Sequence, residues 1–223
     1  FQKTNREVRL ALGHIRSERI PGVSDASDAL PHVQPYYFPD EEQAFSFASN
    51  GHFSTILDIS RDLGFDYTEA GLPTNSAFMA QLIRDVGSKS GGDLEQTLGE
   101  LLPLFGGSPY AFGLATPEQL ITGMGYGIQP LILGTGKEGN VYMATETQAL
   151  DVVGAEFQRP FAPGEMITVD KNGLRHGFVK TTGRICLREY TDYSLDSSQM
   201  PRGKQFITAR QEVGAKLAEE APV

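Results

Sequence analysis

Few residues of this chain have the types and spacing that catalysis or metal binding needs. The histidines show no metal-ligand spacing, and no G-x-S-x-G motif or pair of carboxylates suited to acid–base work stands out. Residues 123–127 read Gly-Met-Gly-Tyr-Gly, but no P-loop lysine or dinucleotide-binding spacing accompanies them, so they indicate a glycine-rich turn. The sequence therefore implies no metal and no cofactor. The histidines are His14, His32, His52 and His176.

Polar residues next to predicted strands and helices remain as candidates. Arg16 follows an alternating segment, Asn50-Gly51 follows a short apolar run, and Asn75 lies in a helix-capping segment. Each has an ordinary structural explanation. An arginine at such a place is more often a surface ion-pair residue, Asn-Gly is a turn signal, and Pro-Thr-Asn-Ser caps a helix. Residue types alone assign no function to them.

The apolar pattern predicts the elements that would position these residues. Strands are expected over 7–15, 45–48 and 186–193, and a hairpin over 110–115 and 118–122. Helices are expected over 54–63, from the cap at 73–76 to Ile83, over 91–104 and over 206–220. Residues 173–184 read as a loop or ribbon.

Segment 141–170 has the clearest punctuation. The apolar run 141–144 predicts a buried strand, and Thr145 then heads a helical turn with Gln148 in capping-box spacing. Pro163-Gly164 predicts a tight turn before a strand over 166–169. Under this interpretation Glu165 is an ordinary surface residue, and its replacement by Gln changes stability by no more than about 1 kcal/mol.

Composition bounds the class of protein. A chain of 223 residues with 39% apolar and 21% charged residues fits one globular domain. The net charge of −9 argues against nucleic acid or an anionic membrane as the main partner. A single cysteine, Cys186, excludes an internal disulfide and suits a reducing compartment. No apolar run approaches membrane-spanning length.

Motifs in the same order over nearly the whole chain resemble one family. They are Gly-Ile-Gln-Pro-Leu-Ile-Leu-Gly at 127–134, Ala-Thr-Glu-Thr-Gln-Ala-Leu-Asp-Val-Val-Gly at 144–154, Pro-Gly-Glu at 163–165 and Cys-Leu-Arg-Glu-Tyr at 186–190. They are similar to motifs of the amidophosphoribosyltransferases. Within these enzymes, the resemblance is to the glutamine amidotransferase domain, a class II, N-terminal-nucleophile (Ntn) module.

The resemblance implies roles for the polar candidates. Arg16 would bind the glutamine α-carboxylate, and the Asn50 side chain with the Gly51 N–H would form the oxyanion hole. Asn75 stands where the family has an aspartate for the substrate α-ammonium, and Ala77 where it has a glutamate. An amide does not supply the negative charge that an ammonium prefers, so this departure implies weakened glutamine binding.

The family's nucleophile has no counterpart in these residues. An Ntn amidohydrolase attacks with the side chain of its first residue and uses its own α-amino group as base. In the family that residue is a cysteine several dozen residues before Gly13, whereas this chain starts at Phe1, and Cys186 matches a structural position. Two explanations stay open: the numbered chain is a fragment, or the protein has abandoned glutaminase chemistry.

The resemblance implies a single α+β domain over 1–223, a four-layer α/β/β/α Ntn-type sandwich, without the family's N-terminal segment or phosphoribosyltransferase domain. The expected function is glutamine hydrolysis that supplies ammonia to a synthase partner, with this chain alone inactive. The alternative is an inactive binding or assembly subunit. We expect a cytoplasmic protein with glutamine or a related small molecule as ligand and with a protein partner or homo-oligomer, but without nucleic acid or membrane.

Overall fold

The computed structural model describes residues 9–15, 30–39, 44–126, 130–182 and 204–221, with helices and two antiparallel sheets. The larger sheet has the strand order β1-β2-β3-β4-β8-β9 and the smaller one β6-β5-β7. The larger sheet consists of β1 (Tyr36–Phe38), β2 (Phe45–Gly51), β3 (Tyr110–Ala115), β4 (Gln119–Met124), β8 (Glu165–Asp170) and β9 (Gly173–Phe178). The smaller sheet consists of β5 (Ile132–Thr135), β6 (Val141–Ala144) and β7 (Glu156–Pro160).

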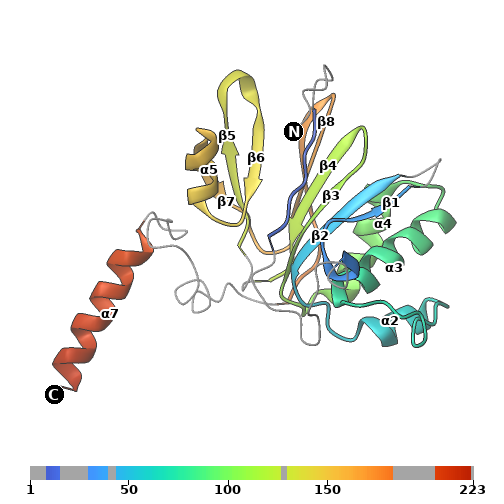
Figure 1. Cartoon of the computed structure of the whole chain (residues 1–223), viewed down its shortest axis with the longest axis horizontal. Coiled ribbons are helices and arrows are strands. Elements are labelled where there is room, and N and C mark those ends of the chain that lie inside the picture. The colour runs from blue at the N-terminus through green and yellow to red at the C-terminus, as the bar shows by residue number, and fades with distance from the viewer. Residues whose placement is uncertain (1–8, 16–29, 40–43, 127–129, 183–203, 222–223) are drawn as a thin grey trace.

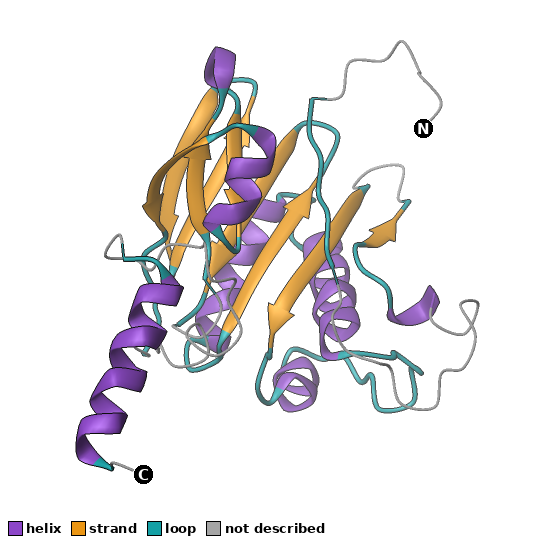
Figure 2. Ribbon diagram, turned by 60° about the vertical axis from the view of Figure 1, so that its left-hand side comes forward, coloured by secondary structure: helices purple, strands orange, loops and turns teal. Residues whose placement is uncertain are grey.

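Helices cover the outer faces of both sheets, as Figures 1 and 2 show. Alongside the larger sheet lie α2 (Ile56–Asp62), α3 (Asn75–Lys89) and α4 (Leu94–Leu101), and α5 (Thr147–Val153) lies outside the smaller sheet. Short 3-10 turns are η1 (Leu30–His32), η2 (Leu102–Phe105) and η3 (Lys137–Gly139). The C-terminal helix α7 (Phe206–Glu220) stands apart from the sandwich in Figure 1. None of the helices in the described ranges has the length and apolarity of a membrane span.

Three apolar clusters confirm the predicted α/β/β/α order of layers. The largest joins the helices to the larger sheet and includes Phe47, Leu82 and Leu98, each with no exposed surface. A second lies between the sheets, where Ile167 meets Leu133. The third packs Leu150 of α5 on Ile132. Because neighbouring strand residues point to opposite faces, Ile132 and Leu133 serve different layers.

Most predicted elements form, but two local expectations are wrong and some strands were not predicted. The described part of 7–15 is an extended segment without strand pairing; its Leu12 side chain instead packs against Gly113. Helix α5 begins at Thr147 with Glu146 as N-cap, so the predicted Thr145 capping box does not form. Strands β1, β5 and β7 were not predicted. Segment 186–193 and Arg16 lie outside the described residues.

The expectation that Glu165 is a surface residue is also wrong. Pro163 and Gly164 form the predicted turn, and β8 follows at once, but the Glu165 side chain is only 2% exposed. Its two oxygens accept hydrogen bonds from Arg159 at 2.6 and 2.8 Å. Arg159 belongs to the smaller sheet and Glu165 to the larger one, so this ion pair links the two sheets.

Candidate functional site

Asn50 and Gly51 are the last two residues of β2, and both are exposed at the end of the larger sheet. They pair with Ala111 and Tyr110 of β3. Gly51 has a φ of +99°, and a Cβ at this position would lie 2.1 Å from the Pro109 carbonyl oxygen. Only glycine fits this close approach, because any side chain would clash with the neighbouring strand. The backbone at the strand end therefore stays uncovered by a side chain of its own.

The residues after Gly51 are held firmly in place. The His52 N–H donates to the Pro109 carbonyl at 2.8 Å, and the Ser54 N–H donates to the Ser108 hydroxyl at 2.9 Å. Phe53, 1% exposed, stacks on the Tyr110 ring with centroids 4.7 Å apart. Hydrogen bonds and a buried aromatic anchor thus fix the chain directly behind Asn50 and Gly51.

The N-terminus of α3 lies against this strand end. Thr74 caps the helix, as predicted, by accepting a hydrogen bond from the Ala77 N–H at 3.1 Å. The Asn75 amide bonds both polar backbone groups of Phe53: Oδ1 accepts from the N–H at 2.7 Å, and Nδ2 donates to the carbonyl at 3.0 Å. The structure therefore brings Asn75 together with Asn50 and Gly51. Arg16, the fourth predicted site residue, lies outside the described residues.

Sequence reasoning missed several residues that hold this strand end. The Ser49 N–H donates to Oε1 of the buried Gln34 at 2.6 Å, and the Ser49 hydroxyl donates to the Ser76 hydroxyl at 2.8 Å. Ser108 supports Ser54, as described above. The Gln-Pro pair at 34–35 before an aromatic residue was the available signal for Gln34; the serines gave none, because their partners are distant in sequence.

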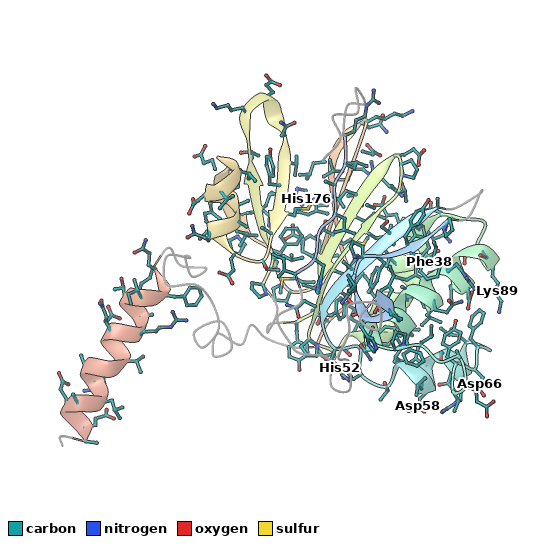
Figure 3. The ribbon with its side chains drawn as sticks, viewed as in Figure 1. Phe38, His52, Asp58, Asp66, Lys89 and His176 are labelled. Carbon is teal, nitrogen blue, oxygen red and sulfur yellow. The ribbon has the colours of Figure 1, made fainter. Side chains whose placement is uncertain are left out.

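One cluster of charged groups in the described chain surrounds Glu165 of β8. The first turn of α3 has no acidic residue. His52 lies at the strand end, whereas His176 lies at a different place on the sheet (Figure 3). His176 Nδ1 is 3.0 Å from Glu165, whose carboxylate also accepts from the Ala162 N–H at 2.8 Å. Burial raises the pKa of Glu165, but the hydrogen bonds from Arg159, Ala162 and His176 outweigh burial and lower it overall.

The described residues offer no metal site, and one cavity that they line lies away from Asn50. In the described ranges, no three His, Cys, Asp or Glu side chains gather as metal ligands would. A cavity of about 250 Å³ lies at the opposite end of β2 and β3, where Leu10, Leu12, Ser46 and Thr116 are among its lining residues. This cavity is separate from the strand end that carries the candidate site.

Comparisons with known proteins agree with the resemblance seen in the motifs. The chain is 35% identical over 185 residues to an amidophosphoribosyltransferase of Mycobacterium tuberculosis, covering 78% of this chain and 34% of that protein. It is 26% identical over 215 residues to a chloroplastic amidophosphoribosyltransferase of Vigna aconitifolia, covering 96% of this chain and 42% of that protein. The chain thus spans between a third and a half of the length of these relatives. No protein-family model matches it.

Two solved structures share the fold. One, described as the allosteric regulatory enzyme of purine biosynthesis, superposes with a TM-score of 0.73 and 27% identity over 86% of this chain and 41% of that one. The glutamine phosphoribosylpyrophosphate amidotransferase from B. subtilis gives a TM-score of 0.71 and 27% identity, with 86% of this chain and 42% of that one covered. The chain is a class II, Ntn-type glutamine amidotransferase-like domain. In this amidotransferase-like domain, Asn50, Gly51 and Asn75 lie together at one end of the larger sheet.

Proposed function

We propose that this domain binds glutamine at the end of β2 and serves its hydrolysis, so that ammonia passes to a synthase partner. The relatives named amidophosphoribosyltransferase support this class of reaction. The observation that carries the proposal is the geometry of Asn50 and Gly51. They are an exposed side-chain amide and a backbone N–H on a rigid strand end that leaves no space for a side chain at Gly51.

The chemistry needs donors that are fixed before the reaction begins. Attack on a carboxamide moves negative charge onto the carbonyl oxygen, and preorganised N–H groups stabilise that charge most in a rigid setting. The Asn50 side chain and the Gly51 N–H are of the right type. Losing one such donor costs a factor of about 10²–10³ in rate in enzymes that use an oxyanion hole. Arg16 would hold the substrate carboxylate as a bidentate partner.

None of the residues given a role above carries a nucleophile that could attack the glutamine carboxamide. The family resemblance implies a structural role for the single cysteine, Cys186, which lies outside the described residues. We therefore expect the 223-residue chain by itself not to turn over glutamine, and we place the attack on an N-terminal cysteine of the kind that the family resemblance implies.

A second candidate function is an assembly subunit, and the open edges of the smaller sheet favour it. Within the described residues, β6 and β7 each have β5 as their one strand neighbour in that sheet. An unpaired strand edge is a ready template for another chain. Under this alternative the sandwich is a docking body, and glutamine does not bind at Asn50.

Binding experiments distinguish the two functions. We would titrate L-glutamine into the 24.3 kDa chain and follow the backbone amide signals by NMR. The amides of 49–54 should shift and saturate at millimolar glutamine. Asn50→Asp, which replaces a donor by an anionic acceptor, should weaken binding by about tenfold or more. Asn140→Asp is the matched control. Asn140 is exposed at the end of η3, and its substitution introduces the same negative charge away from the candidate site.

The result that would refute glutamine binding is equally clear. If saturating glutamine leaves the amides of 49–54 unmoved, or if Asn50→Asp binds as tightly as Asn140→Asp, the strand end is not a glutamine site. The assembly function would then be the better explanation of the fold.

A further inference from the structure

The Asn75 side chain forms two hydrogen bonds with the backbone of Phe53. One side-chain amide satisfies both the N–H and the C=O of a single residue 22 positions away, at 2.7 and 3.0 Å. Asparagine is suited to this because its side chain carries one acceptor oxygen and an NH₂ donor. An aspartate could accept from the Phe53 N–H, but its second oxygen would face the Phe53 carbonyl without a hydrogen.

This pair lies where it can control the position of Asn50 and Gly51. Phe53 follows Gly51 by two residues, and its buried ring is wedged between Tyr110 and Phe105, with ring centroids 4.7 and 5.5 Å away. The neighbouring N–H groups of His52 and Ser54 are tied to the Ser108–Pro109 segment. Asn75 therefore connects this segment to the helix layer. It holds the Phe53 backbone, whereas the Ser108–Pro109 segment holds the backbones of His52 and Ser54.

The same arrangement determines the charge at the N-terminus of α3. Asn75 is the first residue of α3, where the helix dipole contributes partial positive charge. The first turn of α3 has no acidic residue to offset it, and the Asn75 amide is neutral and already engaged on both sides. A cationic group placed here would therefore gain little, whereas a neutral or anionic group would not be opposed.

We propose that Asn75 is a positioning residue that holds Phe53, and with it Asn50 and Gly51, and that the site therefore takes carboxamide ligands without selecting for an α-ammonium group. The ligand part of this inference rests on the proposed function. The positioning part does not, because it follows from the hydrogen bonds alone.

Two readouts test the two parts separately. Amide hydrogen exchange of Phe53 reports on the clamp: Asn75→Ala should speed it by about tenfold or more, while Asn140→Asp leaves it unchanged. Asn75→Asp keeps one hydrogen bond and should give an intermediate rate, which protects the test if Asn75→Ala folds poorly. Unchanged exchange of Phe53 in both Asn75 variants would overturn the positioning role.

Selectivity is measured with L-glutamine and 4-carbamoylbutanoate, which is glutamine without its amino group. The native chain should bind both with affinities within about threefold of each other, and Asn75→Asp should shift the ratio toward L-glutamine by about tenfold. If Asn75 has a purely structural role, Asn75→Asp weakens the binding of both ligands equally and leaves the ratio of their affinities unchanged. That result would overturn the ligand part of the inference. A native chain that prefers L-glutamine by about tenfold or more would also overturn it. If neither ligand binds the native chain, the proposed function fails, and Phe53 exchange still decides the positioning role.

Discussion

Replacing Glu165 by Gln should destabilise the domain, because this carboxylate is the buried half of an ion pair between the two sheets. Its side chain is 2% exposed, and it accepts two hydrogen bonds from Arg159 and one from the Ala162 N–H. Glutamine is nearly isosteric, so no cavity forms. The substitution removes the negative charge, and the NH₂ group that replaces one oxygen would face a donor of Arg159 or Ala162.

The magnitude follows from the exposure of the partner. Breaking a fully buried ion pair costs about 3–5 kcal/mol, but the Arg159 side chain is 39% exposed and can regain water when its partner is lost. Hydrogen bonds to charged groups contribute about 1.5–3 kcal/mol, and one N–H···O bond to Arg159 survives in the variant. We therefore expect a loss of about 2 kcal/mol in the free energy of unfolding. For a chain of this length that corresponds to a Tm lower by about 4–8 °C.

The pH dependence gives an independent check on the mechanism. The folded-state pKa of Glu165 lies below its ordinary value of 4.5. Its contribution to stability is therefore present in full above the unfolded-state pKa, and it is lost as the pH falls through the lower folded-state pKa. Glu165→Gln should consequently cost most at neutral pH, and the difference from the native chain should shrink below about pH 4.

Urea unfolding followed by circular dichroism measures both effects, with Glu156→Gln as the matched control. Glu156 is exposed on β7, the strand that carries Arg159, and its replacement should change the free energy of unfolding by less than about 0.5 kcal/mol. If the two variants are equally stable, or if the cost of Glu165→Gln is the same at pH 3 and pH 7, the ion pair is not what holds this carboxylate in place.

Three further predictions concern activity, packing and assembly. The chain alone should release no glutamate from millimolar glutamine; turnover that survives Cys186→Ser and is free of contaminating enzyme would contradict this. Tyr110→Phe should be neutral or stabilise by up to about 1 kcal/mol, because burial raises the pKa of Tyr110 and its hydroxyl has no hydrogen-bond partner among the described residues. Tyr67→Phe is its counterpart and should cost about 1–2 kcal/mol, since that hydroxyl donates to Asp85 at 2.7 Å; similar losses in both variants would refute the comparison. Native mass spectrometry should show the chain in a complex larger than 24.3 kDa, and a cooperatively folded monomer would show that the edges at β6 and β7 need no partner.

Local sequence signals were enough for the elements that depend on neighbours along the chain. The strand at Val141–Ala144 has the predicted bounds, and Thr74 caps α3 as its spacing indicated. Both depend on side chains within a few residues of each other, which a sequence pattern displays directly. The ordered motifs likewise indicated the class of domain, because their order follows the order of its elements.

Strands whose residues show no regular apolar pattern could be recognised only in the folded structure. Ile132–Thr135 is a strand because β6 and β7 pair with it on both sides, and nothing in four mostly apolar residues announces those partners. Residues 9–15 show the converse case. They alternate as a strand would, yet none of the described strands pairs with them. Alternation predicts which side chains share a face, but it does not predict a hydrogen-bonding partner.

The site divides in the same way. The sequence by itself indicated Asn50, Gly51 and Asn75 as residue types at particular places, and the family resemblance implied that the neutral Asn75 stands at the position of an aspartate. Only the tertiary structure decided what these groups touch: the Asn75 amide closes on Phe53, and Glu165, which looks like the exposed end of a turn, is buried against Arg159. Burial and hydrogen bonding between distant segments depend on how layers pack, and a sequence records the groups but not their distances.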